Sequence, residues 1–189
     1  MREGSAQGEA AGLTTTIFFR RKYMEIFQQV LSQKTLDEVT TELNDKIYEQ
    51  CWRSSQLTWD SELLIGNMGS VSMTELSDTT YDLVMNDIAS KIPKADDLIL
   101  QYFVWHPGAG IAMHNDENYA FGGTIYLTSI EVNYGGFFIW EESTDDYRIY
   151  VPEFNSMVIN KEQKRHMVVP VSLDSKIKRY TIQIFAAKS

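Results

Sequence analysis

The chain has 189 residues, of which 43% are hydrophobic and 23% are charged, and its formal net charge is -9 at pH 7. This length suffices for one domain with a well-filled core, and no apolar run is long enough to span a bilayer. The negative charge would repel a phosphate backbone, which disfavours nucleic acid as a partner. Cys51 is the only cysteine, so an intramolecular disulfide is excluded and a reducing, cytoplasmic location is expected.

The N-terminal region is predicted to contain a tail, a strand and a connecting segment. Residues 1–12 are rich in Gly, Ala, Glu and Ser and lack the apolar core of a secretory signal, so we expect a mobile tail. The β-branched and aromatic residues at 13–19 favour a short strand. Residues 53–71 contain serine, asparagine and glycine around an apolar cluster and are interpreted as a connecting segment.

Two supporting helices are expected between about residues 32 and 92. Apolar residues recur at helical spacing from Leu36 to Cys51 or Trp52, which predicts an amphipathic helix. A second helix is predicted to begin at Ser77 or Asp78, and Pro93 should stop it because proline has no backbone N–H to donate.

From Asp97 onward, short β runs alternate with turn residues. Eight strands are expected, near 98–105, 111–115, 122–129, 135–140, 147–151, 155–160, 166–171 and 177–186. Eight short strands after two helices, without helical crossovers, favour an α+β or mainly β fold. We therefore predict an antiparallel double sheet of jelly-roll type, a cupin-like double-stranded β-helix at about 97–186, within a single domain at 13–189.

Three side chains suggest a metal site. His114 and Asp116 lie at positions i and i+2 of a predicted strand and would point to the same face. His166 begins a later strand, and an antiparallel double sheet can return it to the first pair. Two imidazoles and one carboxylate leave adjacent coordination positions open, as in non-haem Fe(II) oxygenases. The alternative is that His166 only packs and hydrogen-bonds in the core.

The last predicted strand has one unusually polar face. Strand alternation places Arg179, Thr181 and Gln183 together on that face. A buried guanidinium needs an anionic partner, which could be an internal carboxylate or the carboxylate of a bound small molecule. Tyr126, on another alternating strand, could share that carboxylate.

Several segments follow one another in a fixed order: Trp105-x-Pro107-Gly108, His114-x-Asp116, Ile125-Tyr126-Leu127, Gly135-Gly136, His166-x-x-x-Pro170-Val171 and Arg179-Tyr180. Together they make the region from about Leu98 to Phe185 resemble the 2-oxoglutarate and Fe(II)-dependent dioxygenases, with a pattern similar to the prolyl 4-hydroxylase branch. The resemblance covers the C-terminal half and says little about residues 1–95.

The resemblance implies that His114, Asp116 and His166 are the iron ligands and hence the catalytic residues. It also implies that Arg179, assisted by Tyr126, binds the C5 carboxylate of the co-substrate 2-oxoglutarate. With O2, such enzymes convert 2-oxoglutarate to succinate and CO2 and hydroxylate a substrate, with ascorbate as a reductant. The substrate implied is a peptide, in this branch at a proline, or a small molecule.

The chain departs from the branch near the co-substrate pocket. Trp105 stands where the branch usually has a tyrosine, and Ile111 replaces another commonly aromatic residue. We assign Trp105 to the cofactor-binding set, while His106 is interpreted as a surface turn residue. Two other functions fit the same residues: a cupin-like metal enzyme with non-oxygenase chemistry, and a catalytically silent jelly-roll module that binds a partner. The sequence does not reveal the substrate or the oligomeric state.

Overall fold

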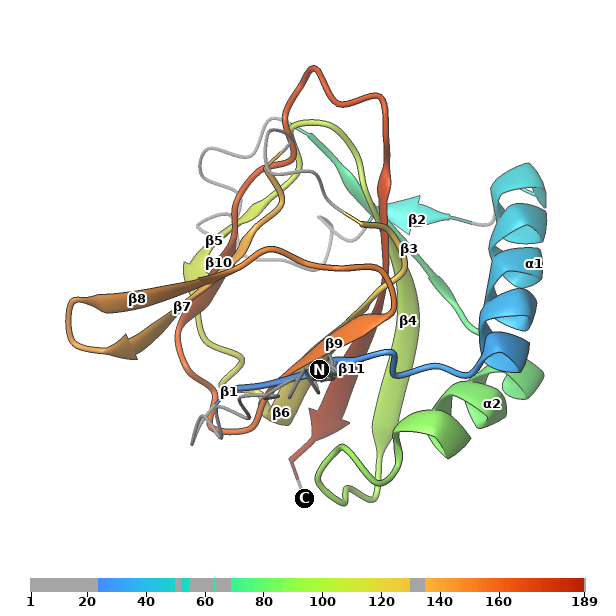
Figure 1. Ribbon diagram of the computed structural model, residues 1–189, viewed down its shortest axis with the longest axis horizontal. Helices are drawn as coiled ribbons and strands as arrows, with labels where there is room; N and C mark the ends of the chain where they lie inside the picture. The colour runs from blue at the N-terminus through green and yellow to red at the C-terminus, as the bar shows by residue number, and fades with distance from the viewer. Residues whose placement is uncertain (1–23, 50–51, 55–62, 64–68, 130–134, 189) are drawn as a thin grey trace, which may run out of the picture.

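The computed structural model describes residues 24–49, 52–54, 63, 69–129 and 135–188, which form two antiparallel sheets and two helices (Figure 1). The predicted tail at 1–12, the predicted strand at 13–19 and Cys51 lie outside these residues. In the described part of the chain, no helix is long and apolar enough to cross a membrane.

The helices are α1 (Gln33–Glu49) and α2 (Asp78–Ile88). The strands are β1 (Met24–Gln28), β2 (Arg53–Ser54), β3 (Val71–Glu75), β4 (Leu98–Trp105), β5 (Ile111–His114), β6 (Tyr119–Tyr126), β7 (Phe138–Ser143), β8 (Asp146–Tyr150), β9 (Ser156–Asn160), β10 (His166–Val168) and β11 (Arg179–Ala187). The large sheet has the strand order β1-β9-β6-β11-β4-β3-β2, and the small sheet has the order β5-β10-β7-β8.

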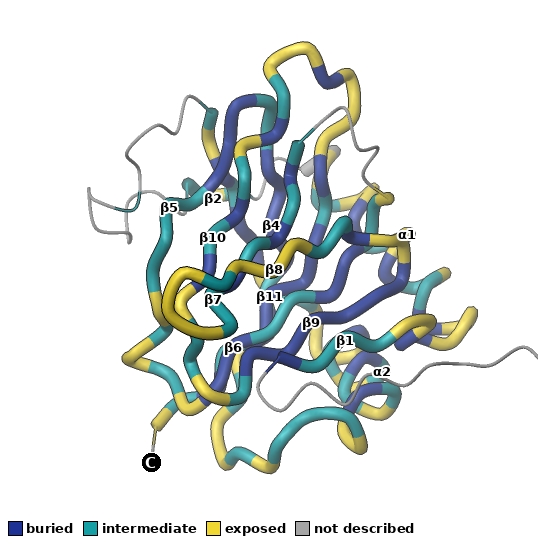
Figure 2. The backbone as a smooth tube through the Cα atoms, turned by 60° about the vertical axis from the view of Figure 1, so that its left-hand side comes forward, coloured by how far each residue is buried: buried dark blue, intermediate teal, exposed yellow. Residues whose placement is uncertain are grey.

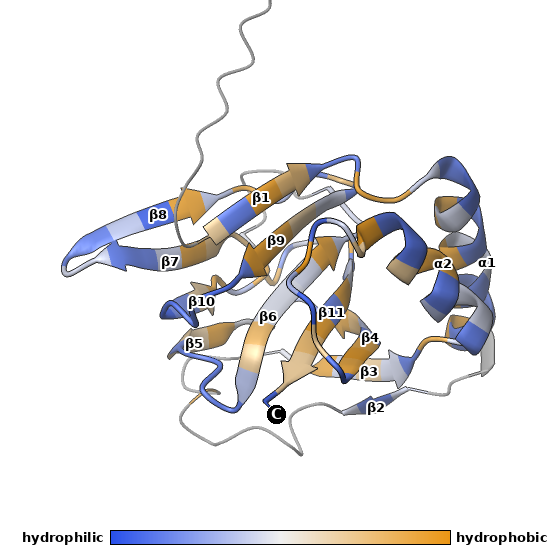
Figure 3. Ribbon diagram, turned by 90° about the horizontal axis from the view of Figure 1, so that it is seen from below, coloured by the Kyte–Doolittle hydropathy of each residue, from blue (hydrophilic) through white to orange (hydrophobic). Residues whose placement is uncertain are grey.

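The two helices cover one face of the large sheet, and Figure 3 shows them next to each other there. α1 contributes Val39 and Leu43, and α2 contributes Val84 and Ile88, each pair spaced by four residues so that both side chains face the sheet. All four are buried against sheet residues such as Ile182 of β11. The helices therefore pack on the face of the large sheet that points away from the small sheet.

A second core fills the space between the two sheets. Phe103 and Trp105 of β4, Tyr126 of β6 and Phe138 and Trp140 of β7 belong to it, and all five are buried. Figure 2 shows buried backbone along β4, β9 and β11, whereas β8, at the edge of the small sheet, is largely exposed. Strand alternation thus gives the large sheet one face for the helices and one for the small sheet.

All eight strands predicted after Asp97 are present, with ends shifted by a few residues. The interpretation of 53–71 as a connecting segment was wrong at its ends, because Arg53–Ser54 and Val71 belong to the antiparallel pair β2–β3. The first helix begins at Gln33, within the predicted region from about residue 32, and the Ser32 hydroxyl caps it by accepting a hydrogen bond from the Thr35 N–H at 3.3 Å. The second helix ends at Ile88, before it reaches Pro93.

Candidate functional site

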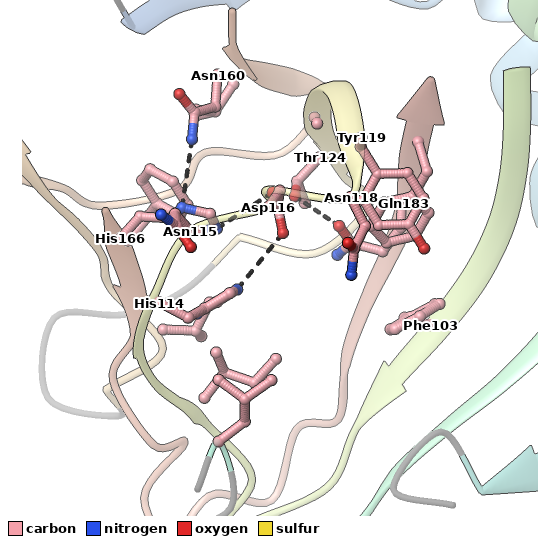
Figure 4. Close-up of a pocket in the computed structure, with 18 of the residues that line it drawn as sticks. Phe103, His114, Asn115, Asp116, Asn118, Tyr119, Thr124, Asn160, His166 and Gln183 are labelled. Carbon is pink, nitrogen blue, oxygen red and sulfur yellow. Dashed lines mark hydrogen bonds and ion pairs between the residues drawn. The ribbon is translucent and has the colours of Figure 1, made fainter. Parts of the chain in front are cut away.

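The structure brings His114, Asp116 and His166 together at one edge of the small sheet. β5 and β10 pair antiparallel with His114 opposite His166, and Asp116 follows two residues after His114. The Nε2 atoms of His114 and His166 each lie 3.6 Å from a different oxygen of Asp116, and one ligand atom from each of the three lies within 4.8 Å of the others. Figure 4 shows Asp116 between the two imidazoles.

Hydrogen bonds fix which nitrogen of each imidazole faces Asp116. His114 Nδ1 lies 2.8 Å from the Ala112 carbonyl, and His166 Nδ1 lies 2.9 Å from the Lys164 carbonyl. A carbonyl oxygen only accepts, so each Nδ1 carries the hydrogen and the Nε2 lone pair of the neutral ring is left free for a metal. Burial lowers the pKa of His166; the Asp116 charge opposes this effect and His114 adds to it. Two neutral imidazoles and a carboxylate are a ligand set for a divalent ion.

Two residues that were not singled out from the sequence shape this cluster. A Cβ added at Gly122 of β6 would lie 2.6 Å from Asp116 Oδ2, so only glycine leaves room for the carboxylate there. Asn160 of β9 is buried; it donates to the Lys164 carbonyl at 2.9 Å and accepts from the Lys164 N–H at 2.9 Å. Because His166 bonds to the same carbonyl, Asn160 holds the backbone that orients the His166 ring.

The cluster lines a cavity of about 460 Å³ between the two sheets. One wall is formed by the three clustered residues, and another by aromatic side chains of the large sheet. The remaining described residues on the cavity wall are Leu63, Phe103, Trp105, Ile111, Asn115, Glu117, Asn118, Tyr119, Gly122, Gly123, Thr124, Phe138, Val158, Asn160, Val168, Gln183 and Phe185. The volume is sufficient for a small organic ligand.

The polar face predicted for the last strand is confirmed. Thr124 donates to Gln183 Oε1 at 2.8 Å, Gln183 Nε2 donates to Thr181 at 3.2 Å, and Trp105 Nε1 donates to the same Thr181 hydroxyl at 3.1 Å. These bonds join β6, β11 and β4 behind the cavity. A chain of satisfied polar groups holds the inner wall in a single arrangement.

Arg179, at the start of the same strand, is buried next to Tyr126 with unused hydrogen-bonding groups. Arg179 Nη1 donates to the Gly136 carbonyl at 3.2 Å, while its Nε and Nη2 and the Tyr126 hydroxyl have no hydrogen-bond partner among the residues that the structure describes. Burial lowers the pKa of Arg179 and raises the pKa of Tyr126 to about 12, and each group opposes the shift of the other. A buried guanidinium stays charged, so these free groups form a site for an anion.

Trp105 lies against both the cavity and this arginine. Its ring lines the cavity, and its centroid is 4.9 Å from the guanidinium carbon of Arg179, which has the Tyr126 ring 5.1 Å away. Neither Arg179 nor Tyr126 reaches the cavity wall itself. Of the residues on the cavity wall, Trp105 thus contacts the guanidinium.

The structure also places the other residues considered from the sequence. His106 lies on the turn after β4, with its Nε2 3.4 Å from the Ser72 hydroxyl, and is not among the described residues of the cavity wall. Gly135 and Gly136 both have φ of 71°, and a Cβ at Gly135 would lie 2.2 Å from the Pro170 carbonyl oxygen. The two glycines thus meet a backbone requirement.

No family model and no curated protein sequence matches the chain. Solved structures do match. A prolyl-4-hydroxylase from Pseudomonas putida superposes with a TM-score of 0.67 at 12% identity, over 88% of this chain and 94% of that chain. A prolyl hydroxylase from Trichoplax adhaerens, in complex with a hypoxia inducible factor peptide fragment, gives a TM-score of 0.64 at 11% identity, over 87% of this chain and 83% of that chain.

A third match is the viral collagen prolyl hydroxylase of Paramecium Bursaria Chlorella virus-1, in a 2-oxoglutarate complex, with a TM-score of 0.57 at 14% identity, over 87% of this chain and 95% of that chain. At these identities the likeness concerns the fold. It extends across both sheets and the helices, well beyond the region that carries the sequence resemblance. The chain has the fold of the 2-oxoglutarate and Fe(II)-dependent oxygenases, as seen in their prolyl 4-hydroxylase branch.

Proposed function

We propose that the chain is an Fe(II)- and 2-oxoglutarate-dependent dioxygenase that hydroxylates a peptidyl or small-molecule substrate. The observation that carries the proposal is the convergence of His114, Asp116 and His166 on one cavity, in the fold of such enzymes. Of the eight strands from β4 to β11, the large sheet contains β4, β6, β9 and β11 and the small sheet contains β5, β7, β8 and β10, so the chain changes sheet at every connection except β7–β8. This supports a double-stranded β-helix of jelly-roll type in a single domain at 13–189.

The residues present fit a divalent iron. Both imidazoles offer Nε2, the carboxylate of Asp116 lies between them, and Gly122 leaves the space that this carboxylate needs. With no cation, an ionised carboxylate would face two lone pairs, which is an unfavourable arrangement. Bound iron would keep the positions facing the cavity open to co-substrate and O2.

The residues also fit a dicarboxylate co-substrate. Within the described residues, the Arg179 nitrogens Nε and Nη2 and the Tyr126 hydroxyl are buried without a hydrogen-bond partner, and a carboxylate would satisfy them. Trp105 lies against the guanidinium and on the cavity wall, which supports its place in the same binding set. The 2-oxoglutarate complex of the viral neighbour supports this choice of co-substrate.

Bound together, Fe(II), 2-oxoglutarate and O2 would supply the oxidation, with 2-oxoglutarate leaving as succinate and CO2. The chain positions the groups and excludes water. Phe103, Phe138 and Val168 give the cavity apolar walls, which limit the access of water to the reacting atoms. A peptidyl substrate is supported by the peptide complex of the Trichoplax neighbour, and ascorbate would serve to restore Fe(II).

Anaerobic reconstitution tests the proposal. Adding 2-oxoglutarate to the Fe(II)-loaded protein should produce a visible charge-transfer band, because a 2-oxo acid chelates the metal. Admitting O2 should then release succinate, and His166→Ala should abolish both signals. Metal binding without oxygen-dependent succinate would indicate a metal enzyme with other chemistry, and absence of metal binding would indicate a silent binding module. Either result would refute the oxygenase.

A further inference from the structure

The cavity wall formed by the large sheet carries an aromatic surface. The ring centroids of Tyr119 and Phe185 are 4.7 Å apart, and those of Phe103 and Phe185 are 6.4 Å apart. All three residues line the cavity, and Figure 4 shows Phe103 and Tyr119 on the side away from His114 and His166. The faces of aromatic rings carry partial negative charge, so this surface accepts apolar groups and cations.

The charged groups on the cavity wall are all acidic. Apart from the two histidines, the charged residues on its described part are Asp116 and Glu117, and no lysine or arginine is among them. Glu117 lies on the turn between β5 and β6, where Asn115 Nδ2 donates to its Oε1 at 2.6 Å. Both residues are exposed, and both are among the described residues of the cavity wall, so the Glu117 carboxylate lies at the open side of the cavity.

The charge balance of the loaded site leaves Glu117 uncompensated. Under the proposed function, the two charges of Fe(II) and the charge of Arg179 are balanced by Asp116 and the two carboxylates of 2-oxoglutarate. Glu117 then gives the remaining space one net negative charge, and the whole chain carries -9. Such a field attracts cations and repels anions before any contact forms.

We infer that the cavity selects a substrate with a permanent positive charge, an ammonium or guanidinium group held between Glu117 and the surface formed by Phe103, Tyr119 and Phe185. The choice of substrate rests on the proposed function, but binding of the cation does not. A cation over an aromatic face and an exposed ion pair both favour binding of such a group. The group can belong to a lysine or arginine of a peptide or to a small amine.

Binding to the full-length protein, with Zn(II) in place of iron and 2-oxoglutarate present, tests the inference. The probes are acetyl-Gly-Lys-Gly-amide, the same peptide with norleucine, the same peptide with glutamate, and n-butylammonium. We expect the lysine peptide to bind roughly tenfold more tightly than the norleucine peptide at low salt, and the glutamate peptide to bind more weakly than either. If butylammonium matches the lysine peptide, the source is a small amine; if it binds much more weakly, the source is a peptide.

Two substitutions show where the preference arises. Glu117→Gln should reduce the lysine preference severalfold without changing the affinity for the norleucine peptide, whereas Tyr119→Leu should weaken binding of the lysine peptide. Glu153→Gln is the matched control, because Glu153 is exposed and lies away from the cavity wall. Equal affinity for the lysine and norleucine peptides, or an unchanged preference in Glu117→Gln, would overturn the inference.

The outcome is separable from that of the proposed function. A lysine preference without oxygen-dependent succinate would keep the binding inference and refute the oxygenase. Succinate formation without a lysine preference would support the oxygenase and refute the binding inference.

Discussion

Gly122→Ala should weaken metal binding without unfolding the protein. The added Cβ would lie 2.6 Å from Asp116 Oδ2, and ordinary contact begins at 3.4 Å, so the carboxylate oxygen must retreat by about 0.8 Å. Metal–ligand distances tolerate only about 0.2 Å. The carboxylate therefore leaves its position between His114 and His166, and we expect the affinity for Co(II) or Fe(II) to fall roughly 10- to 100-fold, the range found for residues that orient ligands.

The neighbouring glycine provides a matched control. A Cβ at Gly123 points to the other face of β6, where it would lie 2.5 Å from Ile159 Cδ1, the end of a flexible side chain in the core behind the sheet. Gly123→Ala should lower the unfolding midpoint but keep the metal affinity. Gly122→Ala should keep the unfolding midpoint but lower the metal affinity. Co(II) absorption titrations and thermal unfolding of both variants measure this. Wild-type affinity in Gly122→Ala would refute the ligand role of Asp116.

Three further changes test other contacts. Trp105→Phe removes the bond to Thr181 and part of the ring next to Arg179, so 2-oxoglutarate should associate severalfold faster in stopped-flow mixing; an unchanged rate would contradict the role of the indole. Asn160→Ala should reduce Co(II) affinity about tenfold, because the carbonyl that orients His166 loses its support. Glu42→Gln should lower the free energy of unfolding by about 1 kcal/mol at pH 7, with little difference from wild type at low pH.

The sign of the Glu42 effect follows from its pKa. Burial alone would raise the pKa of this carboxyl, but hydrogen bonds from Thr80, Ser77 and Lys46, with the charge of Lys46, hold it below 4.5. A folded-state pKa below the unfolded value contributes stability above pH 4.5, and this contribution is lost as the pH falls through the folded-state pKa. Denaturant unfolding from pH 7 to pH 3 should show wild type and Glu42→Gln converging; a constant gap would contradict this account.

Strand alternation made much of the fold and the cluster predictable from the sequence. Residues two apart on a strand share a face, so the pattern placed Thr181 and Gln183 with Arg179, and the structure shows the same face. β3 was missed although it alternates as well, with Val71 and Met73 buried, because only one short run marks it between serine and glycine residues. Its partner β4, which supplies most of its hydrogen bonds, lies far along the chain.

Gly122 and Asn160 could not be identified from the sequence. Gly122 matters because a carboxylate six residues earlier comes back over its Cα, which depends on the turn between β5 and β6. The role of Asn160 depends on two bonds to Lys164 across a turn. Glycine in a strand and asparagine at a strand end occur for several different structural reasons, and only the three-dimensional contacts distinguish among them.

The two unusual features of the site are complementary to two different ligands. A carboxylate placed between two imidazole Nε2 atoms attracts a cation, and a buried guanidinium whose Nε and Nη2 have no partner in the described part of the chain attracts an anion. Both features cost folding free energy in the ligand-free chain, since buried polar groups without partners lose their hydration. In a purely structural β-sandwich, nothing would offset the folding free energy lost at these two features. In a protein that binds a metal and a dicarboxylate, ligand binding offsets this loss.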